Sequence, residues 1–272
     1  MRLRVRPRRS NAATAKTAEI FRLCVVLGLC VLAVVSAACG GAGTLFRPYE
    51  YEEEVYLSLD GTATVFVNSS IAALNALRGT AFNADPAARV DTAAVRAYYA
   101  SPVTRVTRVT QSRRNNRRFA HIRIDVDDIS KLGDAAPFAW STYQFKHDGD
   151  LFVYRQTIGP SAGQDAGKTG WNGSEIVAFR LHVPSKIRYH NTKREVGRGN
   201  ILVWEQPLAD RLHGLPVVSD LTAGAGVLDA RMDAQSILYT TLWLFGTTFL
   251  AVAIAFGAVI WWVMRRGGKT VD

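Results

Sequence analysis

The feature that most constrains this chain is an apolar stretch near its C-terminus, 242–264, which holds 23 residues and no charged side chain. A helix of that length, at about 1.5 Å per residue, crosses a hydrocarbon core of about 30 Å with modest tilt. Trp243 lies at one end of the stretch and Trp261 and Trp262 at the other, where interfacial anchors belong. A buried core helix is the alternative, but the unbroken length and the flanks favour a transmembrane helix over 238–264.

The first 39 residues have the three parts of a secretory signal. An arginine-rich start precedes an apolar run over 24–38, which ends in small residues before Cys39. Three alternatives are open for Cys39. It is an acylated lipoprotein terminus, it follows an ordinary signal cleavage after Ala38, or it is the outer end of an uncleaved membrane helix. Residues 1–39 are therefore a signal peptide or an N-terminal membrane segment.

Basic residues flank both apolar segments. Residues 1–39 carry seven Lys or Arg and one Glu (+6), and residues 242–272 carry three and one Asp (+2), which leaves +2 of the net +10 for the 202 residues between. Because segments rich in Lys and Arg stay in the cytoplasm, we expect residues 40–237 outside the inner (cytoplasmic) membrane of a bacterium and 265–272 as a cytoplasmic tail. A nearly neutral central domain also argues against nucleic acid as a partner.

The central segment alternates hairpins with helices. Apolar–polar alternation on both sides of Asp60 and Gly61 predicts one hairpin, and similar runs around 115–116 and 148–149 predict two more. Strands over 174–183 and 200–206 should pair across a long connection, 184–199, and a last strand over 227–233 leads to the membrane helix. Helices are expected over 71–79, over 85–100 in two parts, with Pro86 early in the first and Asp91 capping the second, and over 207–214. The pattern indicates an α+β fold, a largely antiparallel sheet of hairpins with interspersed helices, plus the C-terminal transmembrane helix.

The chain shows no catalytic or metal-binding pattern. All three cysteines lie within residues 1–39, and the five histidines lack metal-ligand spacing. Residues 162–169 match a loose phosphate-loop pattern that ends in Gly167, Lys168 and Thr169. A phosphate loop needs a helix N-terminus after it, and here the following residues alternate as a strand does. We therefore predict no ATP, no other cofactor and no enzymatic activity.

One basic cluster stands out in the central segment. Guanidinium groups can bind phosphate through two parallel hydrogen bonds, so an arginine cluster is a candidate site for an anionic partner such as a phospholipid head group or a phosphorylated glycolipid. The alternative is a solvated hairpin tip. The six arginines, with no acid among them, are Arg105, Arg108, Arg113, Arg114, Arg117 and Arg118.

The segment VPSKIRYHNTKREVGRGNILVWEQPL, 183–208, resembles the one that marks LppM-type envelope lipoprotein domains. In that group a proline-led strand, an Asn-centred turn and a Gly-Asn-x-x-x-Trp strand recur, and the matching residues here are Pro184, Asn191, Gly199, Asn200 and Trp204. Ser185, where the group more often has glycine, and the inserted helices over 71–100 depart from the pattern. The resemblance implies an exported, membrane-tethered protein that associates with lipid or glycolipid, and it supplies no catalytic residue.

These features predict a membrane-anchored bacterial envelope protein whose extracytoplasmic domain binds lipid, glycolipid or another envelope component. A second hypothesis is a non-catalytic assembly or scaffold partner of another membrane protein. A third, which the residues favour least, is an enzyme acting on envelope glycolipids. The expected partners are membrane lipids and, in the second hypothesis, another envelope protein.

Overall fold

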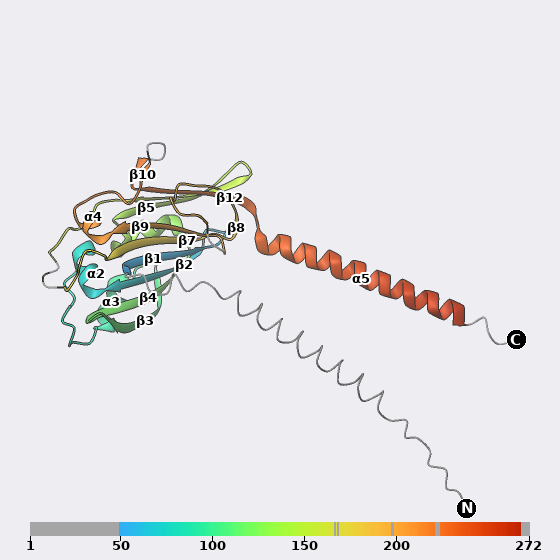
Figure 1. The fold of residues 1–272 in the computed structure, drawn as a ribbon, viewed down its shortest axis with the longest axis horizontal. Coiled ribbons are helices and arrows are strands. Elements are labelled where there is room, and N and C mark those ends of the chain that lie inside the picture. The colour runs from blue at the N-terminus through green and yellow to red at the C-terminus, as the bar shows by residue number, and fades with distance from the viewer. Residues whose placement is uncertain (1–48, 166, 168, 197–198, 221–223, 268–272) are drawn as a thin grey trace, which may run out of the picture. The chain divides into compact units, whose positions relative to one another are not determined.

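The computed structural model describes residues 49–267 except 166, 168, 197–198 and 221–223, and two β-sheets dominate them (Figure 1). Only β1 and β7 pair in parallel, and the other neighbouring strands of the two sheets are antiparallel. The predicted α+β class is confirmed. The larger sheet runs in the order β3 (Arg105–Arg114), β4 (Arg117–Val126), β2 (Ala63–Ser70), β1 (Tyr49–Leu57), β7 (Ile176–His182), β9 (Ile201–Pro207). The smaller runs β5 (Ser141–Asp148), β6 (Leu151–Ile158), β12 (Val227–Ser236), β8 (Ser185–His190).

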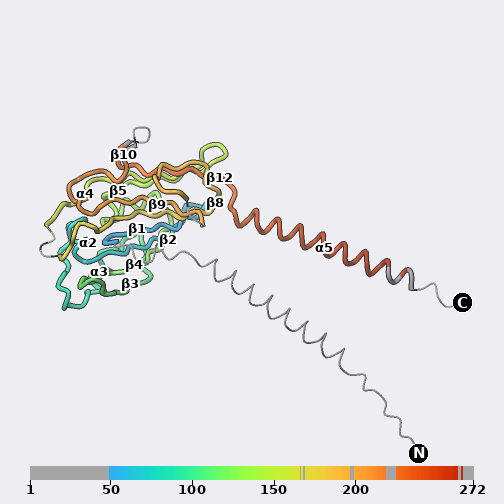
Figure 2. Tube along the Cα trace, viewed as in Figure 1, coloured from blue at the N-terminus to red at the C-terminus, as the bar shows by residue number. Residues whose placement is uncertain are grey.

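The three predicted hairpins are confirmed, and each turns at residues that accept a positive φ. Gly61 has φ 86° between β1 and β2, and Gly149 has φ 60° between β5 and β6. The β3–β4 turn places Asn115 and Asn116 at φ 48° and 55°, the left-handed region that Asn tolerates in two-residue hairpin loops. The fourth predicted pair also forms, as β7 with β9. The chain path between these strands can be followed in Figure 2.

Short helices lie between the strands, and the region 85–100 contains one helix where two were predicted. The prediction of a helix beginning near Pro86 is wrong. Asn83 and Asp85 each accept a hydrogen bond from the backbone N–H two residues later, and these bonds hold the segment in turns. Asp91 caps a helix as predicted, accepting from the backbone N–H of Ala93 and Ala94. The short α-helices are α2 (Ile71–Arg78), α3 (Thr92–Tyr99) and α4 (Leu208–Leu212), and the 3₁₀ turns are η2 (Ile129–Asp134) and η3 (Ala136–Phe138). Two strands of two residues each, β10 (Ser219–Asp220) and β11 (Gly224–Ala225), pair with each other outside the two sheets.

The connection 184–199 also differs from the prediction, because it contains a strand, β8. This strand does not join β7 and β9 in the larger sheet and pairs with β12 at the edge of the smaller sheet. The preference of β8 for the other sheet depends on β12, a strand that comes later in the chain, so the local sequence pattern could not reveal it. The segment therefore crosses from one sheet to the other and back.

A polar cluster lies between the two sheets. The carboxylate of Glu53 on β1, whose residue is 1% exposed, accepts hydrogen bonds from Tyr143 at 2.7 Å and from Gln156 at 3.0 Å on the opposite sheet. Arg78 of α2 pairs with it at 3.4 Å, and the guanidinium lies 3.2 Å from the ring centroid of Trp140. Burial and the charge of Glu53 raise the pKa of Tyr143 well above its usual value, so this hydroxyl stays a donor. Because a buried charge needs its partners, the cluster fixes how the two sheets face each other.

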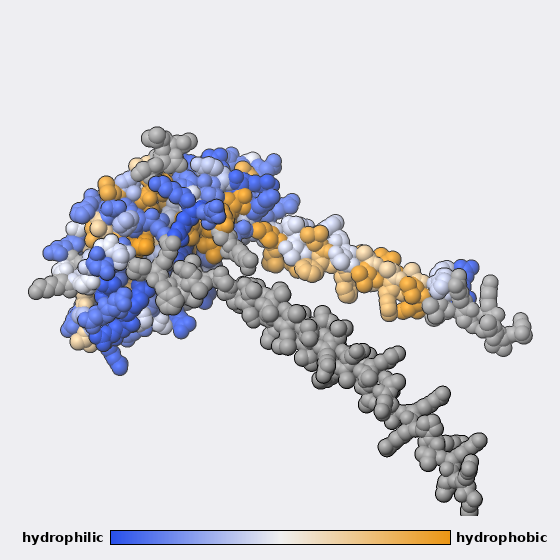
Figure 3. Space-filling model, in the orientation of Figure 1, coloured by the Kyte–Doolittle hydropathy of each residue, from blue (hydrophilic) through white to orange (hydrophobic). Residues whose placement is uncertain are grey.

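The last helix, α5 (Ile237–Gly267), has 31 residues. Its apolar part, Ile237–Trp262, is long enough to cross a membrane and is not buried by the rest of the protein. Figure 3 shows apolar side chains gathered along it. The predicted C-terminal apolar helix is thus confirmed, and it starts directly at the end of β12.

Candidate functional site

The segment that links β8 to β9 builds two neighbouring cavities. β8 is an edge strand of the smaller sheet, and β9 is an edge strand of the larger one. The chain between them therefore connects an edge of one sheet with an edge of the other. The side chains of this stretch and of β8 line a groove on one side and a smaller pocket on the other.

The larger cavity, which we name the β8 groove, has a volume of about 440 Å³ and opens to solvent. Its chemistry is mixed, since cationic and imidazole groups stand beside apolar and aromatic ones. Tyr189, 39% exposed, is one of the domain's exposed aromatics, and the guanidinium of Arg231 lies 5.2 Å from its ring centroid. The lining residues are Lys186, Ile187, Arg188, Tyr189, His190, Val196 and Asn200.

The cations of the β8 groove differ in how far they are neutralised. Arg188 binds Asp233 of β12 through two hydrogen bonds, Nε to Oδ1 at 2.5 Å and Nη2 to Oδ2 at 2.9 Å. The hydrogen bond from Arg188, and then the charges of Arg188 and Lys186, lower the pKa of Asp233. Lys186 is exposed and forms no ion pair with the carboxylates in the described part of the chain. His190 buries its Nδ1 without a described hydrogen-bond partner. Lys186 is therefore the cation most available to an added anion.

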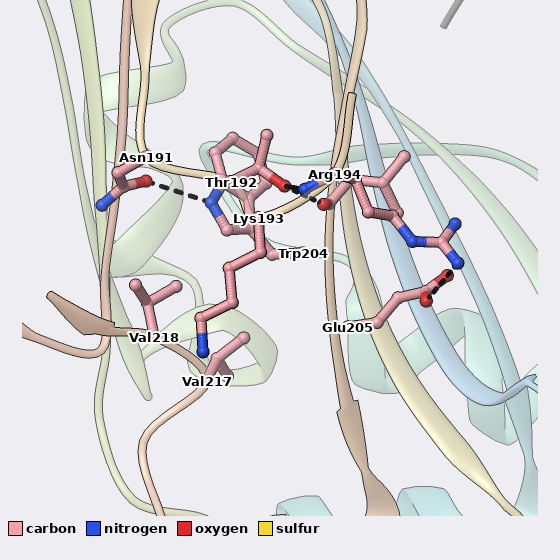
Figure 4. A pocket seen from close by; sticks show the side chains of 9 residues that line it. Asn191, Thr192, Lys193, Arg194, Trp204, Glu205, Val217 and Val218 are labelled. Carbon is pink, nitrogen blue, oxygen red and sulfur yellow. Dashed lines mark hydrogen bonds and ion pairs between the residues drawn. The ribbon is translucent and has the colours of Figure 1, made fainter. Parts of the chain in front are cut away.

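The smaller cavity, the Trp204 pocket, has a volume of about 190 Å³ (Figure 4). Asn191 forms its floor, because its Oδ1 accepts from Trp204 Nε1 and from the backbone N–H of Asp229, both at 3.0 Å, and its Nδ2 donates to the carbonyl of Val227 at 2.7 Å. Figure 4 shows the side chain of Lys193 reaching toward Val217. The pocket thus joins β9, the end of β8 and the stretch before β10.

The residues that carry the family resemblance hold this segment in place. Gly199 has φ 90° and Asn200 φ 54°, a turn that brings the chain back to β9. Asn200 Nδ2 donates to the carbonyl of Ser185 at 3.1 Å, and the Pro184 carbonyl accepts from the N–H of Ile237 at 3.1 Å. Trp204 is 3% exposed. These residues, with Asn191, position the walls of the two cavities rather than standing free in them.

The predicted arginine cluster does not form one surface. Arg117 turns inward, 7% exposed, and pairs with Glu50 at 2.9 Å and Glu175 at 3.5 Å. Arg118 is half-buried and donates to the carbonyl of Pro86 at 2.9 Å. The other four are exposed, and three of them have partners within the domain: Arg105 with Asp125, Arg113 with Asn116, and Arg114 with the Tyr49 carbonyl. Arg108 faces Arg123 across the strands, and its side chain forms no hydrogen bond or ion pair with a described residue.

The phosphate-loop match lies between β6 and β7. Gly167 and Thr169 belong to an irregular loop that leads into the strand β7, and no described residue between them and that strand is helical. The helix N-terminus that holds phosphate in such a loop is thus missing from this stretch. Lys168 and Cys39 lie outside the described residues.

A row of polar side chains crosses the face of the larger sheet opposite to Glu53. Ser112 Oγ lies 2.7 Å from His121 Nε2, His121 Nδ1 lies 2.9 Å from Asn68 Oδ1, and Asn68 Nδ2 donates to Glu52 at 3.1 Å. Burial, and then the charge of Arg114, lower the pKa of His121. Sequence spacing gave no hint of this row, because its members come from four different strands. The order resembles a nucleophile, base and orienting amide, but neither the β8 groove nor the Trp204 pocket includes any of them.

A metal site is not visible in the described region, where no group of three or more His, Cys, Asp or Glu side chains could hold an ion. The side chains that line the two cavities instead provide hydrogen-bonding groups, positive charge and aromatic surface.

Comparison with known proteins gives one match. No protein-family model matches the chain, and no curated protein matches it. Among solved structures the chain is similar to the folded domain of LppM from Mycobacterium tuberculosis, with a TM-score of 0.35 and 11% identity, over 70% of this chain and 94% of that one. LppM gives its name to the group that the segment 183–208 resembles.

Proposed function

We propose that this chain is a membrane-anchored protein of the bacterial envelope whose domain binds the anionic head group of an envelope lipid or glycolipid in the β8 groove. In this proposal α5 spans the inner membrane, the domain lies on the extracytoplasmic side, and the C-terminus is cytoplasmic. The apolar span Ile237–Trp262 supports the anchor. Arg265 and Arg266, three and four residues after its end, support the orientation.

The observation that carries the proposal is the short path from the membrane helix to the groove. The N–H of Ile237, the first residue of α5, donates to the carbonyl of Pro184 at 3.1 Å. Lys186, the first cation of the groove, follows two residues later on β8. At about 3.3 Å per residue along a strand, the cationic part of β8 begins within about 10 Å of the point where the chain enters α5. A head group in the outer leaflet therefore lies within reach of the groove.

The lining favours a phosphate-bearing head group over a neutral one. Lys186 provides an exposed positive charge without a described ion-pair partner, and Arg188 beside it neutralises Asp233 through two hydrogen bonds, so that this carboxylate repels an anion less. Tyr189 and Val196 offer apolar contact to a glycerol or sugar moiety beside that charge. Polar groups that fix orientation within a partly apolar recess are what small-ligand sites commonly combine.

The test measures binding to the purified full-length chain in a neutral detergent. The anionic probe is dioctanoyl phosphatidylglycerol, and dioctanoyl phosphatidylcholine is the zwitterionic control. We expect saturable binding of the anionic probe only, and its loss when Lys186→Ala is combined with Arg188→Ala. Lys193→Ala, which removes a lysine from the neighbouring Trp204 pocket, is the matched control and should keep binding. Equal binding of both probes, or equal binding by the double variant, would refute the proposal.

We further propose that the protein binds without catalysing a reaction. Ser112 Oγ, 2.7 Å from His121 Nε2, lies on the face of the larger sheet and outside both cavities. Treatment of the full-length chain with a fluorophosphonate probe should leave Ser112 unlabelled. Labelling that is abolished by His121→Ala would show an activated nucleophile and would support the enzyme hypothesis instead.

A further inference from the structure

The junction between the domain and the membrane helix has no linker. β12 ends at Ser236 and α5 begins at Ile237. Besides the bond from Ile237 N–H to the Pro184 carbonyl, the N–H of Leu238 donates to Ser236 Oγ at 3.2 Å. A Gly- or Ser-rich linker would let the domain turn freely above the membrane. Here the first turn of the helix is hydrogen-bonded to the start of β8, so one end of the sheets must lie next to the membrane that α5 enters.

Strand register identifies what else lies at this end, which we name the junction end. Two residues separate the end of β7 from the start of β8, and β1 lies parallel to β7 with Tyr56 opposite His182. The turn after β1, at Asp60 and Gly61, is therefore at the junction end of the larger sheet. In the smaller sheet the N–H of Ala234 donates to the carbonyl of Asp150 at 3.3 Å, which places the β5–β6 turn at the same end.

The arginine-bearing β3–β4 turn lies at the opposite end. Val126, the last residue of β4, pairs with Ala63 at the junction end, whereas Arg117, the first residue of β4, pairs with Arg114 beside the turn. Nine residues of extended strand separate the two ends, which is about 30 Å at about 3.3 Å per residue. The exposed arginines of this turn, Arg113 and Arg114, are held that far from the junction end.

The junction end carries charges of both signs. Its exposed aspartates are Asp60, Asp127, Asp148 and Asp150, and its exposed cations are Arg105, Lys131, Lys146, Lys186 and Arg188. An anionic bilayer repels such carboxylates over about 8–10 Å at physiological salt. Arg105, Lys131 and Arg188 are paired with aspartates of the same region, so the favourable path for a single head group is along Lys186 into the β8 groove.

We infer that the junction end is the surface that faces the lipid head groups, and that the β3–β4 arginine turn is presented away from that bilayer. This inference rests on the part of the proposed function in which α5 spans a membrane, and it does not require that the groove bind a ligand. It assigns the bilayer contact to a surface of mixed charge instead of to the arginine-rich turn. The fold makes this assignment because the membrane helix leaves from the other end of the strands.

The experiment measures the distance of single labelled positions from the head groups in vesicles of phosphatidylcholine and phosphatidylglycerol. Cys24, Cys30 and Cys39 are replaced by serine in the full-length chain, which leaves no other cysteine. Single cysteines are then introduced at exposed positions and given a fluorophore. The junction-end variants are Asp127→Cys and Asp148→Cys, the far-end variants are Arg113→Cys and Thr157→Cys, and Val252→Cys reports on the middle of α5.

A quencher attached to lipid head groups should quench both junction-end labels several-fold more strongly than both far-end labels, because about 20–30 Å of strand separates them. An acyl-chain quencher should quench Val252→Cys. If that label is not quenched, α5 is not inserted, and the membrane anchor of the proposed function fails together with this inference. If Val252→Cys is quenched but the far-end labels match or exceed the junction-end labels, the inference alone is overturned.

Discussion

The β3–β4 hairpin and the β8 groove are the two basic regions of the domain, and they contrast in what their charges do. The hairpin is rich in arginine, yet Arg117 is buried between Glu50 and Glu175 and Arg118 donates to a backbone carbonyl. The groove has fewer cations, yet Lys186 is exposed, has no ion-pair partner in the described region and lies two residues from the strand end that is bonded to α5.

The contrast shows that the number of basic residues is a poor guide to an anion site. A guanidinium that already satisfies a buried carboxylate contributes to stability and is not available to a ligand, because removing it from that partner leaves a buried charge alone. An exposed cation without an ion-pair partner can bind an anion without breaking an existing interaction, and a position near the membrane brings it close to lipid head groups. Four predictions test this distinction, in order of decreasing effect.

Arg117→Ala should destabilise the domain strongly and leave lipid binding by the folded protein unchanged. Glu50 and Glu175 are 0% and 4% exposed in their side chains, so the substitution leaves two buried carboxylates without their cation. We expect a loss of about 3–5 kcal/mol in the free energy of unfolding, measured by urea titration with tryptophan fluorescence. Arg113→Ala, at an exposed position of the same hairpin, is the control and should stay within about 0.5 kcal/mol. Equal effects of the two variants would contradict the distinction.

Asn191→Ala should destabilise the segment that forms both cavities. The side chain makes three hydrogen bonds, to Trp204, to the N–H of Asp229 and to the carbonyl of Val227. Leaving such partners unsatisfied costs about 1–3 kcal/mol, again measured by urea titration. Asn191→Asp keeps the acceptor and loses the donor to Val227, so it should fall between the wild type and Asn191→Ala. An unchanged unfolding free energy in Asn191→Ala would show that the segment is held by other contacts.

Lys186→Glu should weaken binding of dioctanoyl phosphatidylglycerol about tenfold, which corresponds to about 1.4 kcal/mol, without changing stability. The same charge reversal in the hairpin, Arg113→Glu, should change the affinity less than about twofold, or about 0.4 kcal/mol. Isothermal titration calorimetry on the two full-length variants makes the comparison. If Arg113→Glu has the larger effect, the hairpin and not the groove is the anion site.

The pair of Glu54 and His182 should give a small, pH-dependent contribution to stability. Burial alone would raise the pKa of Glu54, but the hydrogen bond and charge of His182, 2.6 Å away, outweigh it and lower the pKa below the ordinary 4.5. A carboxyl whose pKa is lower in the folded state stabilises the fold above its unfolded pKa and loses that contribution as the pH falls through the folded value. We expect less than about 1 kcal/mol, seen as a steeper loss of stability below pH 4.5 in the wild type than in His182→Gln. Parallel pH profiles would show that the pair contributes nothing.

Much of the fold could be predicted from the sequence where the deciding interactions are local. The hairpin turns at Gly61, at Asn115 and Asn116 and at Gly149 depend on residues that accept positive φ. Such turns can be recognised from four or five consecutive residues. Asp91 caps its helix through bonds to the next turn. The Pro86 helix failed for a local reason as well, since Asn83 and Asp85 compete for the same backbone groups.

The candidate site could be predicted only in part. The segment 183–208 was singled out by its resemblance, and its Asn and Gly residues do shape the cavities. The pairing of β8 with β12, and so the groove itself, was missed because it depends on a strand distant in sequence. The arginine cluster was visible as composition, but its division into buried and exposed members depends on Glu50 and Glu175, which precede and follow it by many residues.

The sequence by itself determined the apolar C-terminal helix, the hairpins and the α+β class, because length, hydropathy and turn chemistry act within a few residues. Only the tertiary structure decided which charges are neutralised, which strand forms the open edge, and which end of the sheets meets α5. Those outcomes depend on the pairing of strands far apart in the chain, and a buried charge is stable only where that pairing brings it a partner.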